Sequence, residues 1–454
     1  MRATGSPENL VSQPSQQSIR DALKGDLHIL DWEGRWAVFG AVSGLLLPLT
    51  EGEAESLRLF LAGVPVEEQV SQETAVALLH RILGALRARK IAHEGLPAVA
   101  ALLLILTEDC NLACRYCYCR RALAGHPAAC MDVSTARRAI EFATENGIHT
   151  VAFFGGEPLL NMPALRAAVS RARELGASMD FSLSTNATLV TEAFGEYCHE
   201  NGIRVSVSMD GPREVHDAAR VHQDGSGSYD AAMRGVDILR KWQVLQLLEA
   251  THSMQHPAAI GKSMEALAAR FPRVSCTCVD GPDDCSYADH IVTGRRYALY
   301  YQELLEFAGA AQLQGRSIQV GGIDELLAQF AADQVPHRPY ICSGVMQRLS
   351  VSVDGSLYPC PETQQPRHRI GSLWEAWDPA ALDARRRAAL APLRRDRLHD
   401  CWYKHLADVC VVRLREDGRG RLVVRDSEAI ESGLRCLLTE VAHSDLLNAH
   451  RASA

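Results

Sequence analysis

The sequence lacks the features that would place the chain in a membrane or on nucleic acid. Its longest apolar run, Leu96–Leu106, is well short of the ~18 residues that a membrane span needs. A formal net charge of −8 gives no electrostatic case for binding nucleic acid or anionic lipid. The polar N-terminus contains no apolar segment of the kind found in secretory signals. We therefore expect a cytoplasmic protein with neither a membrane nor a nucleic acid as partner.

Cysteine, by contrast, is abundant. The chain has 14 cysteines in 454 residues, and without a secretory signal these do not indicate a disulfide framework. In a reducing compartment such cysteines more often bind metal or take part in chemistry. With 47% hydrophobic and 22% charged residues, the chain can also bury a sizeable core.

The pattern along the chain divides it into four parts. Residues 1–20 are expected to form a flexible tail, and residues 21–95 a small α+β module with a hairpin of strands at 27–32 and 35–39. Residues 96–317 alternate between strand and helix patterns. Residues 318–454 have shorter elements and more cysteine, which indicates a separate C-terminal domain.

The alternating part predicts an α/β fold with six parallel strands. Such βαβ units with right-handed crossovers curve into a partial (β/α)6 barrel of TIM-like type, with reactive groups at the carboxyl ends of the strands. The predicted strands are 99–106, 150–154, 180–184, 204–209, 246–252 and 274–279, and the helices between them are 134–146, 163–175, 191–201, 229–242 and 258–271.

Three cysteines, Cys110, Cys114 and Cys117, lie in a loop directly after the first of these strands. A four-iron cluster normally takes four protein thiolates, so three leave one iron open to a small molecule. A zinc site is the alternative, but zinc prefers paired Cys-x2-Cys knuckles and no second knuckle follows. The spacing Cys-x3-Cys-x2-Cys, with Tyr116 before the third cysteine, resembles the signature of the radical S-adenosylmethionine (SAM) enzymes. This resemblance implies that the three cysteines bind a catalytic [4Fe–4S] cluster.

Later loops carry residues that the same resemblance assigns to SAM. Two glycines let a ligand approach the backbone, and a carboxylate can pair with an ammonium group. Strand-end Ser and Asn are also common turn residues, and a surface salt bridge explains Arg220 equally well. Ala187 stands where the family usually has glycine. The implied SAM contacts are Tyr116, Gly155, Gly156, Glu157, Ser184, Asn186, Ser208 and Arg220.

The C-terminal region resembles a SPASM domain, an extension that binds auxiliary iron–sulfur clusters. The resemblance begins with the element from Gly355 to Cys360, and two later ligand positions are taken by Lys404 and Leu414. One auxiliary cluster, two clusters with substitute ligands, or none, with the cysteines as buried hydrophobes, all remain open. The implied metal ligands are Cys342, Cys360, Cys401, Cys410 and Cys436, with Cys276, Cys278 and Cys285 as substitute ligands or free thiols.

The resemblance implies a peptide maturase. A 5′-deoxyadenosyl radical would remove hydrogen from a ribosomal precursor peptide and give an intramolecular carbon–carbon or thioether cross-link, with flavodoxin or ferredoxin as electron donor. A peptide strand could add beside residues 35–39. A side-chain oxidase of sulfatase-maturase type is the enzyme alternative, although Pro361 stands where those enzymes carry an Asp base, followed here by Glu362. A non-catalytic iron–sulfur electron carrier or scaffold is the alternative from another class.

Overall fold

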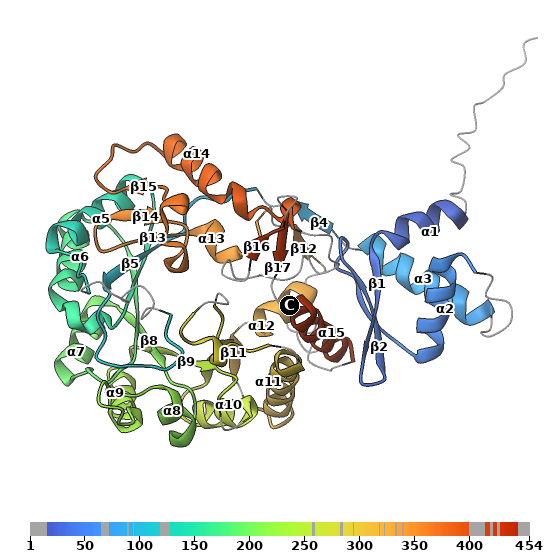
Figure 1. Cartoon of the computed structure of the whole chain (residues 1–454), viewed down its shortest axis with the longest axis horizontal. Coiled ribbons are helices and arrows are strands. Elements are labelled where there is room, and N and C mark those ends of the chain that lie inside the picture. Colours follow the sequence, from blue (N-terminus) through green and yellow to red (C-terminus); the bar gives the residue numbers. More distant parts are fainter. Residues whose placement is uncertain are drawn as a thin grey trace, which may run out of the picture.

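The structure is a computed structural model of the chain. Figure 1 shows the N-terminal module, drawn in blue, at one end of the molecule and the large sheet with its helices at the other. The structure describes residues 16–64, 72–88, 90–93, 95–118, 128–256, 259–281, 285–293, 295–316, 318–321, 323–331, 334–337, 340–398, 414–417, 421–424 and 427–443.

The N-terminal module is a three-stranded antiparallel sheet with helices against it. The predicted hairpin turn is confirmed at Glu33 and Gly34, whose positive φ angles of 50° and 79° suit a tight two-residue turn. Thr50 and Glu53 form a capping box at the start of the helix that follows. The elements are α1 (Gln16–Lys24), β1 (Leu27–Trp32), β2 (Arg35–Gly40), β3 (Leu46–Leu49), α2 (Glu51–Ala62) and α3 (Gln72–Ala88).

The order of this sheet is β1-β2-β3, and it corrects one expectation. Strand β2 pairs with β1 on one side and with β3 on the other, so both its backbone edges are occupied. A peptide strand therefore cannot add beside residues 35–39, and the outer strands β1 and β3 are the edges of this sheet.

The predicted barrel is confirmed as a parallel sheet with helices between its strands. Six strands follow one another in the order of the sequence, and β11 (Gln319–Gly321) extends the row. The strands are β5 (Ala101–Thr107), β6 (Thr150–Gly155), β7 (Asp180–Thr185), β8 (Arg204–Ser208), β9 (Leu245–His252) and β10 (Arg273–Cys278). The helices are α5 (Val133–Glu145), η1 (Pro158–Asn161), α6 (Met162–Glu174), α7 (Glu192–Asn201), α8 (Arg213–Ala219), α9 (Tyr229–Lys241), α10 (Ile260–Ala268), η2 (Ala288–His290) and α11 (Arg295–Leu313).

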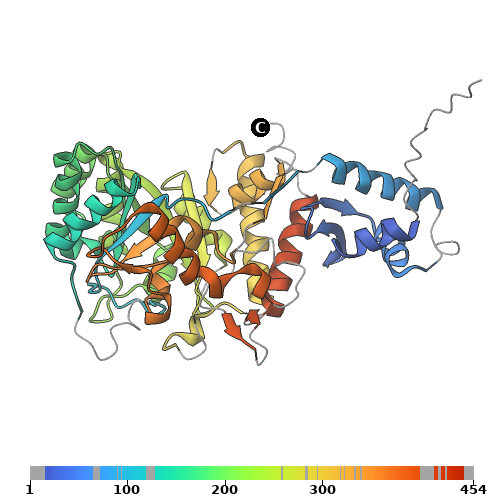
Figure 2. The ribbon, with the colours of Figure 1, turned by 90° about the horizontal axis from the view of Figure 1, so that it is seen from above.

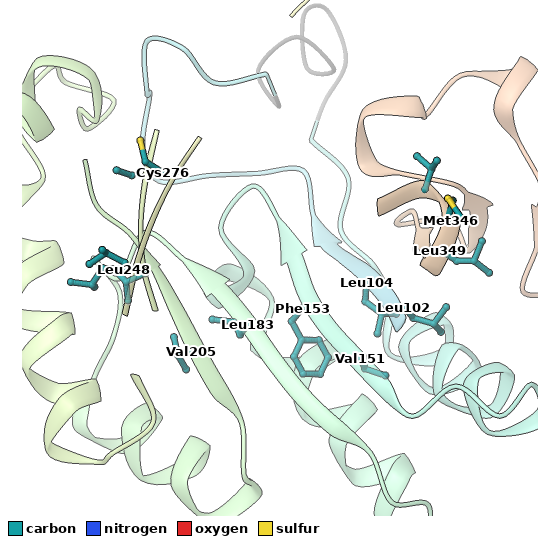
Figure 3. Packing of buried hydrophobic residues seen from close by; sticks show 14 of the residues in the cluster. Leu102, Leu104, Val151, Phe153, Leu183, Val205, Leu248, Cys276, Met346 and Leu349 are labelled. Carbon is teal, nitrogen blue, oxygen red and sulfur yellow. The ribbon is translucent and has the colours of Figure 1, made fainter. Parts of the chain in front are cut away.

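One face of this sheet forms the main core with the helices. Alternate strand residues such as Leu104, Phe153 and Leu183 are almost fully buried and belong to one cluster with alanines and aliphatic side chains of the helices. Figure 3 shows this packing from strand to strand. The residues between them, among them Ser184 and Ser206, are half-buried and lie on the opposite face, which we call the inner face.

The C-terminal region continues the same sheet. Strand β13 (Arg348–Val351) pairs in parallel with β5, β14 (Ser356–Tyr358) pairs antiparallel with β13, and β15 (Gly371–Ser372) pairs antiparallel with β14. The edge of β5 is therefore covered by a strand from far along the chain. The other elements are β4 (Lys90–His93), α12 (Ile323–Ala331), β12 (Gln334–His337), α13 (Ser343–Gln347), η3 (Pro361–Thr363), η4 (Pro366–His368), α14 (Pro379–Leu390), η5 (Ala391–Leu393), η6 (Arg395–Arg397), β16 (Leu414–Glu416) and β17 (Leu422–Val424).

Helix α15 (Ser427–His443) lies between the barrel and the N-terminal module, as Figures 1 and 2 show. It packs along α11 and also reaches the small sheet, where Arg435 donates a hydrogen bond of 3.3 Å to the carbonyl oxygen of Ile29. An ion pair of 2.7 Å joins Arg35 to Glu440. Helix α15 thus connects the N-terminal module to the barrel through contacts with both. In the part of the chain that the structure describes, every helix is too short or too polar to cross a bilayer.

Candidate active site

The three-cysteine loop is held by the segment that follows α8. The backbone amide of Ala113 donates to Val221 (2.7 Å), and that of Arg115 donates to Ala219 (2.9 Å). The side-chain amide of Gln223 donates to the carbonyl oxygens of Cys110 (3.2 Å) and Leu112 (3.1 Å). Gln223 was not predicted as part of the site, because the neighbouring sequence does not indicate that its side chain contacts the cysteine loop.

The loop thiols are partly buried and close enough to influence one another electrostatically. Burial raises the pKa of Cys110 to about 11 and that of Cys114 to about 12, and Arg220 partly opposes the second shift. Among the described residues, no three His, Cys, Asp or Glu side chains are arranged around a point suited to a single metal ion. A four-iron cluster asks for a wider arrangement, because each thiolate binds a different iron. Buried thiols that resist ionisation on their own suit a ligand that supplies positive charge.

The glycine turn after β6 lies directly against the start of the cysteine loop. A Cβ at Gly155, where φ is +136°, would lie 2.3 Å from the carbonyl oxygen of Thr107. A Cβ at Gly156 would lie 2.1 Å from the carbonyl oxygen of Asp109. These distances leave no room for any other residue. The two glycines therefore let the turn and the cysteine loop meet backbone to backbone.

Glu157 is fully buried and is hydrogen-bonded to the carboxyl end of the neighbouring strand β7. Its carboxylate accepts hydrogen bonds from the hydroxyl of Thr185 (2.7 Å) and from the backbone amides of Asn186 (2.9 Å) and Leu159 (3.1 Å). Burial raises its pKa, and these hydrogen bonds oppose the rise. In the described structure Glu157 is a positioning residue with both carboxylate oxygens engaged.

A buried ionic cluster joins Tyr116 to Arg220 through Asp210. The Tyr116 hydroxyl donates to one Asp210 carboxylate oxygen (2.5 Å), and Arg220 pairs with the other at 3.0 Å. The amide of Thr251 also donates to Asp210 (3.0 Å). Although burial would raise it, the pKa of Asp210 is lowered, chiefly by the charge of Arg220. The Arg220 Nε atom is buried and has no hydrogen-bond partner among the residues that the structure describes.

Arg220 is thus a buried cation in the site rather than half of a surface salt bridge. Asp210 was not among the residues expected in the site, and its role as the counter-ion was missed. The signal that could have found it is the nearby Arg220, because a fully buried carboxylate requires a partner.

Asn186, Ser184 and Ser208 lie at or near the ends of β7 and β8. Asn186 donates a hydrogen bond to Asn111 (3.0 Å) and lies 3.8 Å from the Cys110 sulfur, so it contacts the cysteine loop directly. Ser184 and Ser208 are half-buried on the inner face. The structure therefore gathers the residues predicted to contact SAM around one end of the sheet.

The C-terminal cysteines are only partly described. Cys342 and Cys360 are half-buried and close enough to interact, and burial chiefly raises the pKa of Cys360 to about 12. Cys436 is fully buried in α15. Leu414 begins β16, opposite Val424. Cys401, Lys404 and Cys410 lie outside the described residues.

In the β10 region, Cys276, Cys278 and Cys285 pack against other side chains of the protein. Cys276 and Cys285 are buried, and the hydroxyl of Tyr300 donates to the carbonyl oxygen of Cys276 (2.6 Å). Cys285 packs in a small cluster with Tyr116 and Tyr287. Every described cysteine is a free thiol.

The fold and the site define an α/β protein of the radical SAM type. The sequence profile described as the radical SAM superfamily matches residues 104–244, which include the cysteine loop, the glycine turn, Asp210 and Arg220. These residues are therefore a radical SAM domain.

Curated relatives make the comparison more specific. A cysteine-type anaerobic sulfatase-maturating enzyme of Clostridium novyi is 24% identical over 293 residues, 61% of this chain and 77% of the relative. A serine-type enzyme of Klebsiella aerogenes is 29% identical over 296 residues, 61% of this chain and 69% of the relative. An uncharacterized protein of Archaeoglobus fulgidus is 28% identical, and the chain spans only 60% of its length.

Solved structures share the fold. Native anSMEcpe with bound AdoMet (SAM) has a TM-score of 0.65 at 19% identity and covers 78% of this chain and all of its own. SuiB of Streptococcus suis, bound to S-adenosylmethionine, has a TM-score of 0.50 at 13% identity and covers 85% of this chain and 95% of its own. At these identities the likeness concerns the fold alone.

Proposed function

We propose that the chain is a radical SAM peptide maturase that acts on a ribosomal precursor peptide. The observation that carries the proposal is the meeting of three thiols, the glycine turn and a buried arginine at one end of the parallel sheet. When bound, a reduced [4Fe–4S] cluster and SAM supply a carbon radical able to remove a hydrogen atom from an unactivated carbon.

The chain's own residues bind and orient these groups. Cys110, Cys114 and Cys117 hold the cluster, and the backbone of Gly155 and Gly156 gives the amino group of SAM close access. Arg220 offers its unpaired Nε atom to the carboxylate, while Asp210 fixes the guanidinium from the other side. Ser184, Asn186, Ser208 and Tyr116 complete the surroundings of SAM.

A peptide is the proposed substrate, and a cross-link the proposed product. The structure of anSMEcpe with bound AdoMet and the Kp18Cys peptide supports a peptide substrate, with a TM-score of 0.65. The N-terminal module would bind part of the precursor at the outer edge of β1 or β3. We place the enzyme in the cytoplasm, where its many thiols stay reduced, with flavodoxin or ferredoxin as electron donor and one auxiliary cluster beside Cys342 and Cys360.

A side-chain oxidase of sulfatase-maturase type is the second candidate. The Clostridium and Klebsiella relatives favour it. Pro361, which has no proton-accepting group, opposes it. The two products are distinguishable, because an oxidised side chain gives a carbonyl that reacts with a hydrazide, whereas a cross-link gives a peptide whose fragments stay joined in tandem mass spectrometry.

The test is production of 5′-deoxyadenosine by the anaerobically reconstituted, reduced protein, followed by co-expression with a precursor peptide encoded beside the gene. We expect SAM cleavage and a peptide lighter by two hydrogens. Cys114→Ala should abolish cleavage, whereas the matched variant Cys198→Ala, in the core on α7, should retain it. Cleavage that persists in Cys114→Ala would refute the ligand assignment, and an unchanged peptide mass would refute the cross-link.

A further inference from the structure

One carboxylate on the inner face of the barrel has no part in the site described above. Glu249 lies on β9 between Leu248 and Ala250, which both face the core, so its side chain lies on the inner face. The register places it beside Ser208 of β8 and Ser275 of β10. Its carboxylate is therefore half-buried between two strands that carry short hydroxyl side chains.

Glu249 is free of the contacts that engage the other acidic groups of the site. Within the described ranges, no hydrogen bond or ion pair reaches its carboxylate, and only the charges of Arg220 and Arg348 act on it at longer range. By comparison, Glu157 accepts three hydrogen bonds and Asp210 is bound by Tyr116 and Arg220. Glu249 is thus available to a substrate on the inner face.

Two arginines act on Glu249 through their charges, and each of them also acts on a cysteine. The charge of Arg220 reaches Cys114 in the first loop, and the charge of Arg348 reaches Cys360 in the C-terminal region. The charges of both arginines also act on the Glu249 carboxylate.

Every product considered for this enzyme requires a proton acceptor. After a substrate carbon has lost a hydrogen atom to the SAM-derived radical, a thioether forms when a thiol S–H breaks and a C–S bond is made. A C–C cross-link or a carbonyl likewise breaks one C–H or O–H bond. In each case one proton and one electron leave, and an oxidised iron–sulfur cluster held beside Cys342 and Cys360 would accept the electron.

We propose that Glu249 is the catalytic base that accepts this proton, an inference that rests on the proposed function. Burial raises the pKa of its carboxyl group, with Arg220 and Arg348 opposing the rise, and a base of raised pKa is the better proton acceptor near neutral pH. Pro361 provides no such group on the C-terminal side. In this proposal the base comes from β9, in the wall of the barrel.

The test compares Glu249→Gln, which keeps the shape but not the basicity, with Glu249→Asp and the matched exposed variant Glu200→Gln. The probe is a synthetic copy of the precursor peptide that the wild-type protein converts, deuterated at the reacting carbon. Three quantities are measured: peptide affinity by fluorescence anisotropy without SAM, deuterium in 5′-deoxyadenosine, and oxidised peptide formed per 5′-deoxyadenosine.

For Glu249→Gln we expect peptide affinity within twofold of wild type and continued deuterium transfer. Oxidised peptide per 5′-deoxyadenosine should fall by about 100-fold or more, the usual contribution of a general base. Glu249→Asp should recover part of the loss, and Glu200→Gln should match wild type.

An unchanged product ratio in Glu249→Gln would overturn the proposal. So would a loss confined to peptide affinity, which would make Glu249 a recognition residue. A loss of deuterium transfer with affinity intact would also overturn it, because the defect would then precede proton removal. If the wild-type protein cleaves SAM but converts no peptide, the proposed function has failed and this inference fails with it.

Discussion

Gly156→Ala tests whether the glycine turn and the cysteine loop meet as tightly as the structure indicates. The new Cβ would lie 2.1 Å from the carbonyl oxygen of Asp109 and 2.6 Å from its carbonyl carbon. Both are backbone atoms, so no side-chain rotation can relieve the overlap. The backbone next to Cys110 must move by about 1 Å to reach an acceptable contact.

The cost follows from two contributions. Overpacking of this kind costs roughly 1–3 kcal/mol. The shift also disturbs the hydrogen bond of 2.8 Å from the Glu157 amide to the Asp109 carbonyl oxygen, worth about 1 kcal/mol. We therefore expect Gly156→Ala to lower the free energy of unfolding by about 2–4 kcal/mol, and to displace Cys110 enough to reduce iron binding.

Urea unfolding followed by circular dichroism gives the stability, and the iron and sulfide content of the reconstituted protein gives the state of the loop. The matched control is Gly84→Ala in α3, where a Cβ meets nothing within 4 Å and helix propensity favours alanine by about 1 kcal/mol. A Gly156→Ala protein with wild-type iron content and an unfolding free energy within about 0.5 kcal/mol of wild type would refute this reasoning.

Three further substitutions test other parts of the structure. Asp210→Asn leaves Arg220 buried without its counter-ion, and we expect a loss of about 3–5 kcal/mol in chemical denaturation. Gly235→Ala brings a Cβ within 2.2 Å of the Ala187 carbonyl oxygen, and its melting temperature should fall as for a loss of about 1–3 kcal/mol. Arginine hydrogen bonds lower the pKa of Glu174 from 4.5 to about 2, so its stabilising effect is complete above pH 4.5 and lost as pH falls toward 2. The free energy of unfolding should therefore fall less between about pH 5.5 and about pH 3 in Glu174→Gln than in the wild type.

The barrel strands were predictable from the sequence because parallel strands covered by helices are apolar and separated by helix-period segments. The predicted strand 180–184 differs from β7 by one residue, and 274–279 differs from β10 by one residue at each end. The meeting of the cysteine loop with Gly155 and Gly156 was also predictable, since the carboxyl ends of neighbouring parallel strands lie at one edge of a sheet.

The position of β2 was not predictable. Strand β3 is short and contains Pro48, which lacks an amide hydrogen and weakens any strand pattern, although proline is tolerated at the edge of a sheet. Without β3, the hairpin strand 35–39 looked like an edge. Glu249 escaped notice for a similar reason: its half-buried place on the inner face follows from register with Ser208 and Ser275, and local sequence does not reveal the register of parallel strands.

Pairing of β13 with β5 has a consequence for electron transfer. The cysteine loop begins directly after β5, while Cys342 precedes β13 and Cys360 follows β14, at the open end of this hairpin. Both groups of thiols are therefore attached to neighbouring strands of one hydrogen-bonded sheet, and β13 also closes an edge that would otherwise be exposed. A change of domain orientation cannot alter their separation without breaking strand hydrogen bonds. Lys404 and Leu414 would thus affect how an auxiliary cluster is bound in the C-terminal region, while the spacing between Cys360 and the first loop is set by the sheet.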